Sequence, residues 1–333
     1  MRTSLFRGHR APVPSAPPEI DGSSGAVEPA GWAAEHHADV LGLVAAHGAA
    51  VVTGLGLRTV SDVVAVLTEL DLSPVRETEG FAPRTPYADG VYSSAAWPPQ
   101  RPMCMHHELS YAGQFPGLLC FACLEAPTAG GATGLADAAA VLDALPEDEV
   151  ARFEAEGWIL TRAYHEEIGA SLSQAFGTDD PAAIGAYCRA NGIDADWRPD
   201  GSLRTRQHRR AVVRHPDTGR RCWFNQIAFL NQWTMDPEVR QFLVDEYGPD
   251  GLPFDTRYGN GDPVPADTVE LINRAYEAHT VRRPWRDGDL MLVDNVRTAH
   301  SREPYEGPRR VVVAMADPKR QTTPEGRTGS AVT

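Results

Sequence analysis

Two neighbouring side chains, His106 and Glu108, have the chemistry of metal ligands. Residues i and i+2 of an extended strand point to the same side, so both can reach one ion while His107 faces away. A His-x-Glu pattern alone is a weak signal, because chance produces it often. A third ligand is available in His300, which follows the apolar run Leu290–Asp294. Two histidines and one carboxylate leave adjacent metal positions open for other ligands, which is the arrangement of non-heme iron(II) oxygenases.

The chain contains eleven histidines, so the combination of residues carries more weight than any one of them. From roughly residue 48 to residue 317 the sequence resembles the taurine dioxygenase-like (clavaminate synthase-like) superfamily of iron(II)- and 2-oxoglutarate-dependent oxygenases, and within it the branch that hydroxylates amino acids and peptides in natural-product pathways. Five segments in the family's order carry the resemblance: MHHELSYA at 105–112, GGATGLAD at 130–137, CWFNQ at 222–226, GDLMLVDN at 288–295 and AHSREPYEGPRRVVVAM at 299–315.

The resemblance implies a mainly β fold with flanking helices, a double-stranded β-helix or jelly roll with the metal at its mouth. It implies iron(II) held by His106, Glu108 and His300, with 2-oxoglutarate and O2 as co-substrates. The family takes from the strand after the distal histidine an arginine whose guanidinium fork binds the far carboxylate of 2-oxoglutarate. Arg309 and Arg310 are the candidates; because side chains alternate along a strand, only one points inward, and Arg309 is preferred.

Four further side chains are candidates for contact with small molecules. Thr133 matches the threonine that in relatives also touches 2-oxoglutarate; the alternative is a strand-end hydroxyl bonded to backbone. Asn225 faces the substrate pocket, orients the metal face, or is a structural amide. Ser94 and Trp97 belong to a lid region, roughly residues 76–102, and are candidates for substrate contact, although most residues of such loops simply pack.

The expected reaction is hydroxylation of an unactivated carbon, with release of succinate and carbon dioxide. The expected substrate is an amino acid or an amino-acid-derived molecule of secondary metabolism, such as antibiotic biosynthesis, and it is free, peptide-bound or held on a carrier protein. Desaturation or ring closure would use the same residues. Related halogenases replace the metal-binding carboxylate with a small residue, so Glu108 argues against halogenation. Two alternatives are a 2-oxoglutarate-independent dioxygenase or isomerase, which the GPRR motif at 307–310 disfavours, and a non-catalytic binding protein, which the loss of a metal ligand would mark.

The elements that position these residues are predicted from hydrophobic periodicity and from Gly and Pro. Helical spacing is present at residues 32–46, 60–70, 135–145, 147–156, 237–247 and 267–278. Strands are predicted at 49–53, 290–294 and 310–316, and a β-hairpin at 211–225 around the turn-forming residues 216–219. Asp294 and Asn295 are expected to support the fold near the metal. Together these elements predict one domain at 31–320, between a partly ordered arm at 1–30 and a flexible tail at 321–333.

Charge and composition exclude several other classes of protein. The formal net charge of -14 argues against a general nucleic-acid binder, because neutralising phosphates requires clustered Lys and Arg. Seven arginines between Arg204 and Arg221 are a local exception, and they indicate either a solvated hairpin or a docking patch for an anionic substrate or carrier protein. No run of about 18 apolar residues is present, so no membrane span is expected.

The five cysteines indicate a reduced, cytoplasmic location, because they are odd in number, widely spread and not preceded by a secretory signal. Cys120 and Cys123 form a CxxC pattern, but no second pair at zinc spacing is nearby. Their apolar surroundings predict a buried strand.

Overall fold

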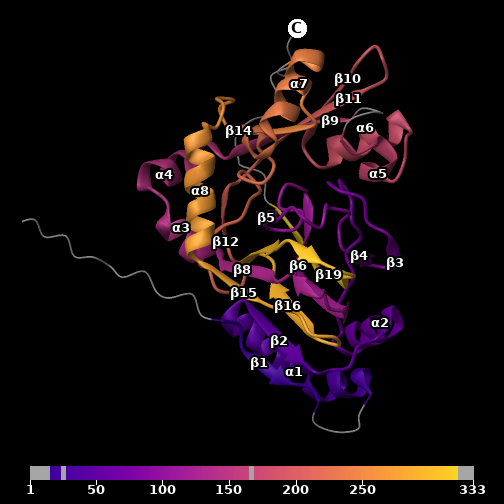
Figure 1. Ribbon diagram of the computed structural model, residues 1–333. Helices are drawn as coiled ribbons and strands as arrows, with labels where there is room; N and C mark the ends of the chain where they lie inside the picture. The colour runs from indigo at the N-terminus through magenta and orange to yellow at the C-terminus, as the bar shows by residue number, and fades with distance from the viewer. Residues whose placement is uncertain (1–15, 24–27, 165–168, 249, 322–333) are drawn as a thin grey trace, which may run out of the picture.

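A computed structural model describes residues 16–23, 28–164, 169–248 and 250–321. Two sheets pack face to face at its centre (Figure 1). The larger has seven strands in the order β1 (Glu19–Asp21), β2 (Ala49–Thr53), β16 (Leu290–Asp294), β6 (Gln114–Glu125), β19 (Arg310–Arg320), β4 (Val91–Ser93) and β3 (Pro86–Ala88). The smaller has four, in the order β15 (Thr280–Arg283), β8 (Thr133–Asp137), β17 (Thr298–Arg302) and β5 (Met103–His106).

Strand β6 contributes side chains to two hydrophobic cores, one on each face of the larger sheet. Successive side chains of a strand point to opposite faces, so Phe121 and Cys123 enter the core between the sheets. Cys120 and Ala122 face the other way, into a second core under α1 (Pro29–His47) and α2 (Val60–Glu69). The predicted buried strand is therefore confirmed. Because Cys120 and Cys123 lie on opposite faces of the sheet, they do not share a site.

A third sheet lies at the end of the molecule opposite α1 and α2 (Figure 1). Its antiparallel strands are β10 (Ile193–Trp197), β11 (Leu203–Arg209), β9 (Trp158–Tyr164) and β14 (Phe254–Tyr258). The helices around it are α5 (Leu172–Phe176), α6 (Pro181–Ala190) and α7 (Pro237–Tyr247). Buried Arg162 joins this sheet to the rest of the molecule, because its guanidinium donates to the carbonyl oxygens of Glu79 (2.7 Å) and Gly80 (2.9 Å).

The remaining elements cover the flank of the two central sheets. They are α3 (Ala138–Ala144), α4 (Glu147–Glu156), α8 (Ala266–Ala278), the 3-10 turn Gln232–Thr234, the hairpin β12 (Val212–Arg214) with β13 (Arg221–Trp223), and the pair β7 (Ala129–Gly130) with β18 (Tyr305–Glu306). The prediction of a helix at 135–145 is wrong for its first turn. Residues 133–137 form β8, and the helix begins only at Ala138, where the Asp137 carboxylate accepts from the backbone N–H groups of Ala139 and Ala140.

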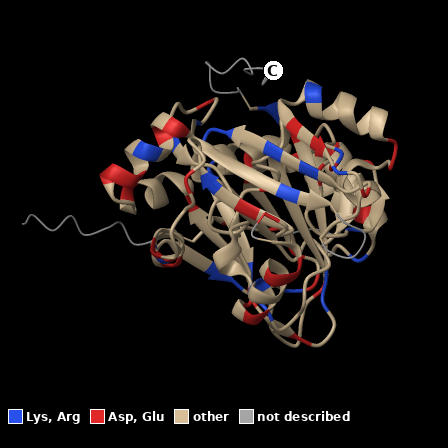
Figure 2. Ribbon diagram, turned by 90° about the horizontal axis from the view of Figure 1, so that it is seen from above, with Lys and Arg blue, Asp and Glu red and all other residues tan. Residues whose placement is uncertain are grey.

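The arginine-rich stretch does not form a single feature. Figure 2 shows basic and acidic positions interspersed on the face that it displays. Arg209 is buried in β11, while only part of the stretch belongs to the hairpin. Four of the arginines have acidic partners: Arg204 with Asp250, Arg206 with Asp194, Arg220 with Asp137 and Arg221 with Glu154. None of the described helices is long and apolar enough to cross a membrane.

Candidate metal and co-substrate site

The three predicted metal ligands come together between the central sheets. His106 ends β5 and is the cross-strand partner of His300 in β17, so both imidazoles lie on the same face. The candidate ligand atoms of His106, Glu108 and His300 all lie within 4.8 Å of one another. All three residues are buried. The three residues predicted as metal ligands thus form one compact cluster, and their binding of a metal stays a prediction.

Glu108 reaches the cluster from a turn, and not from the strand that the sequence analysis assumed. Strand β5 ends at His106, and the following turn contains Leu109 with a φ of 53°. Asn295, which is fully buried, fixes this turn: its Oδ1 accepts from the Glu108 N–H at 2.8 Å, and its Nδ2 donates to the Glu108 carbonyl at 2.9 Å. The expected fold-supporting role of Asn295 has this physical form.

Burial prepares both imidazoles for a cation, and a hydrogen bond also orients that of His106. The Nδ1 of His106 lies 2.8 Å from the Cys104 carbonyl, so it carries the proton and leaves the Nε2 lone pair for a metal. Burial lowers the pKa of His106, although the Glu108 carboxylate opposes this shift. Burial also places the pKa of His300 well below its usual range, with His106 adding to the effect. Two neutral imidazoles and a carboxylate form a donor set that suits iron(II).

One cation already touches the cluster. Arg84 Nη2 donates to Glu108 Oε2 at 2.8 Å, and Arg84 Nε lies 3.3 Å from Glu77 Oε1. The arginine is buried with both carboxylates, so little solvent screens these contacts. This part of the chain is the predicted lid, and its contact with Glu108 is not predictable from the sequence, because no local pattern relates positions 84 and 108.

The two candidate arginines for 2-oxoglutarate have different environments. Arg310 is exposed, whereas Arg309 is partly buried beside Gly131 and Ser94, and its Nη1 lies 3.5 Å from Ser94 Oγ. Desolvation lowers the pKa of Arg309 to about 10, and nearby Arg302 acts in the same direction. Within the described residues no carboxylate lies within 4.0 Å of this guanidinium. A largely desolvated cation without an anion is costly unless a ligand supplies one.

Three comparisons with known proteins assign this arrangement to a family. The model of the "Taurine catabolism dioxygenase TauD, TfdA family" matches residues 16–315. The chain belongs to this family. It is therefore an iron(II)- and 2-oxoglutarate-dependent dioxygenase, and the expected fold class, enzyme class and co-substrates are confirmed.

Individual relatives show the likeness over most of the chain. The dapdiamide synthesis protein DdaC of Enterobacter agglomerans is 34% identical over 258 residues, which are 78% of each chain. A clavaminate synthase-like protein of Arabidopsis thaliana is 26% identical over 279 residues, which are 80% of this chain and 81% of that protein. The crystal structure of a putative alpha-ketoglutarate-dependent taurine dioxygenase from Burkholderia xenovorans covers 96% of this chain and 95% of its own, with 15% identity and a TM-score of 0.51. This last likeness shows the jelly-roll fold.

Thr133 lies in β8, beside the strand that carries His300. It is the cross-strand partner of Arg302, and Leu135 is the partner of His300, so Thr133 shares the inner face of the sheet with the histidine. Its hydroxyl accepts a hydrogen bond at 3.0 Å from the indole N–H of Trp285, and not from the backbone. Arg302 donates to three carbonyl oxygens of the lid, at residues 97, 98 and 101.

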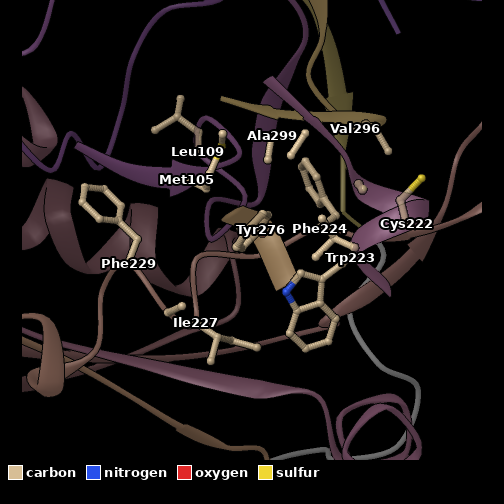
Figure 3. Packing of buried hydrophobic residues seen from close by; sticks show 14 of the residues in the cluster. Met105, Leu109, Cys222, Trp223, Phe224, Ile227, Phe229, Tyr276, Val296 and Ala299 are labelled. Carbon is tan, nitrogen blue, oxygen red and sulfur yellow. The ribbon is translucent and has the colours of Figure 1, made fainter. Parts of the chain in front are cut away.

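The candidate substrate residues have three different environments. Trp97 packs against Phe229, whose ring stacks on His106 with centroids 4.9 Å apart, so Trp97 forms part of an aromatic wall beside the cluster. Ser94 contacts Arg309, on the co-substrate side. Asn225 is buried, and its amide bonds the backbone of residues 211 and 227, which favours the structural alternative. Figure 3 shows Phe229 near Met105, the residue before His106. Sequence periodicity gave no signal for Phe229, because it lies in an irregular segment.

Proposed function

We propose that His106, Glu108 and His300 hold iron(II), and that Arg309 binds the distal carboxylate of 2-oxoglutarate. The observation that supports this assignment best is the spacing of the inner-face residues. Moving two residues along β17 leads from His300 to Arg302, and the same step along β8 leads from Leu135 to Thr133. Two residues of a strand span about 6.6 Å, a distance that matches a five-carbon dicarboxylate chelated to the metal at one end.

The larger sheet repeats this spacing. Phe121 of β6 lies 5.1 Å from the His300 ring, and two residues further along the same strand Cys123 pairs with Val311. A bulge between Arg310 and Val311 interrupts the strand alternation here. Arg309, just before β19, lies beside Gly131, two residues from Thr133, whereas Arg310 is exposed. We infer that the partly buried guanidinium of Arg309, which has no carboxylate partner among the described residues, binds the end of the co-substrate that lies away from the triad.

Bound iron(II), with 2-oxoglutarate and O2, supplies the oxidising power that inserts one oxygen atom into a C–H bond and releases succinate and carbon dioxide. The residues of the protein orient the metal ligands and exclude water from the site. Cys104 fixes the tautomer of His106, and Asn295 fixes the turn that carries Glu108. The aromatic wall of Trp97 and Phe229 keeps water from the His106 side of the site.

The proposed reaction is hydroxylation of an unactivated carbon in an amino acid or an amino-acid-derived molecule that is free, peptide-bound or carrier-bound. The relative named for dapdiamide synthesis supports a role in making a small natural product. The metal-binding carboxylate is present in Glu108, which supports oxygen insertion in preference to halogenation.

The decisive experiment has two stages. Anaerobic titration of the protein with iron(II) and then 2-oxoglutarate should produce the weak visible charge-transfer band of the chelate in wild type and not in His300→Ala. Succinate release is then measured with a panel of free amino acids, their N-acylated forms and their carrier-bound thioesters, and each product is examined by mass spectrometry. Addition of one oxygen atom to a panel member supports the proposal. Iron binding without the band would refute the assignment of the co-substrate to this site.

A further inference from the structure

The hydrogen bond between Trp285 and Thr133 has a direction that chemistry fixes. An indole N–H only donates, so the Thr133 oxygen is the acceptor in the 3.0 Å contact. A threonine hydroxyl also carries one proton of its own, and this proton needs an acceptor. Both side chains are buried, so bulk water does not provide one.

The unused proton of Thr133 lies at the co-substrate end of the site. Across the part of the chain that the structure describes, no acceptor takes it. Thr133 pairs with Arg302, and Arg302 is close enough to Arg309 to lower the pKa of that guanidinium. Gly131, two residues before Thr133, packs directly against the Arg309 side chain: a Cβ at Gly131 would lie 3.3 Å from Arg309 Cδ. The hydroxyl proton of Thr133 and the guanidinium of Arg309 therefore belong to the same small region of the site.

We propose that Trp285 is a positioning residue for the co-substrate: it holds Thr133 as an acceptor, so that the hydroxyl proton points to the distal carboxylate of 2-oxoglutarate. Among the described residues no hydrogen bond or ring contact joins Trp285 to the metal triad or to Arg309, so the proposed role is exerted through Thr133. The inference rests on the proposed binding of 2-oxoglutarate between the triad and Arg309. It adds a second buried donor to that carboxylate, and it gives a function to a tryptophan in the loop between β15 and β16.

The chain offers a matched control for this tryptophan. Trp223 is also fully buried in the core between the sheets, and Figure 3 shows its indole among apolar side chains. Its Nε1 has no hydrogen-bond partner among the described residues. Trp223→Phe therefore removes similar apolar volume without removing an oriented donor.

The experiment measures the Kd of 2-oxoglutarate anaerobically from the charge-transfer band of the iron(II) protein. Trp285→Phe and Thr133→Val should each weaken binding by about fivefold, the size of one hydrogen bond to a buried group. The double variant should be no weaker than Thr133→Val, because both substitutions remove the same interaction. Trp223→Phe should bind as wild type does.

A second ligand separates positioning from general damage to the core. 2-Oxopentanoate has the same chain with a methyl group in place of the distal carboxylate, so its binding should be unaffected by Trp285→Phe. Equal weakening of both ligands, additive effects in the double variant, or a Trp285→Phe that matches Trp223→Phe would overturn the inference. If Arg309→Ala also binds 2-oxoglutarate as wild type does, the proposed co-substrate site is itself wrong, and this result is distinct from a failure of Trp285 alone.

Discussion

The guanidinium of Arg84 donates to the carboxylate of Glu108 at 2.8 Å, inside the cluster that is proposed to bind iron. Glu77 Oε1 lies 3.3 Å from Arg84 Nε, so one guanidinium forms ion pairs with two largely buried carboxylates. This trio joins the lid to the metal site. It also gives Glu108 a counter-charge that does not depend on the metal.

Replacing Arg84 with Met should destabilise the metal-free protein by about 3 kcal/mol, because removal of one partner leaves buried charge uncompensated. A divalent cation should restore part of this loss, since it supplies the missing positive charge beside Glu108. The thermal shift on adding Mn(II) should therefore be larger in Arg84→Met than in wild type. Urea unfolding and melting curves measure both effects.

Arg76→Met is the control for this prediction. Arg76 pairs with Asp89 at 2.7 Å, but its side chain is 82% exposed, and such surface pairs contribute about 0–1 kcal/mol. If Arg84→Met proves no less stable than Arg76→Met, the buried trio has no energetic importance.

The metal triad predicts a common phenotype for three substitutions. His106→Ala, Glu108→Ala and His300→Ala should each lose iron(II) binding and succinate formation while the fold is retained, because each removes one ligand of a single ion. Metal content by elemental analysis and far-UV circular dichroism test these two points. The exposed His47→Ala is the matched histidine control and should bind metal normally. Full activity in any one of the three variants would remove that residue from the site.

The triad could be predicted because its members are recognised by residue type, short spacing and the segment in which they lie. His106 and Glu108 are two residues apart, and the His300 segment is one of five in the family's order. Arg84 could not be predicted in this way, because its contact with Glu108 depends on where the lid folds. The same limit applies to Trp285 and Thr133, which are 152 residues apart.

The third sheet escaped prediction for a different physical reason. The buried face of β11 consists of Leu203, Thr205, Gln207 and Arg209, of which three are polar. Hydrophobic alternation is therefore absent from a strand that is nevertheless half buried. Hydrogen bonds replace apolar packing there: Gln207 and Arg209 both donate to the carbonyl of Tyr111. Such pairing is visible only after the chain has folded.

The two neighbouring arginines should have unequal effects on the co-substrate. Arg309→Ala should weaken 2-oxoglutarate binding by about a hundredfold, roughly the 3 kcal/mol of a charge-assisted bond at a desolvated site. The exposed Arg310→Ala should change it less than about twofold. Anaerobic titration of the chelate band gives both Kd values. The reverse ranking would transfer the role to Arg310.

Glu77 should make stability depend on pH in a direction opposite to that of most carboxylates. Burial raises its pKa to about 7, with the Arg84 guanidinium opposing that shift. Between about pH 4.5 and 7 the folded protein therefore holds a proton that the unfolded chain has released, so the free energy of unfolding falls as pH rises through this window. Glu77→Gln removes this effect.

The stability of Glu77→Gln relative to wild type should thus increase by roughly 2–3 kcal/mol between pH 4.5 and 8, as measured by urea unfolding of the metal-free protein. Glu154→Gln, which changes an exposed carboxylate paired with Arg221, is the control and should show a nearly constant difference over the same range. A constant difference for Glu77→Gln as well would mean that Arg84 compensates the Glu77 carboxylate fully. The Glu77 carboxylate would then stay ionised in the folded protein over the whole range of the experiment.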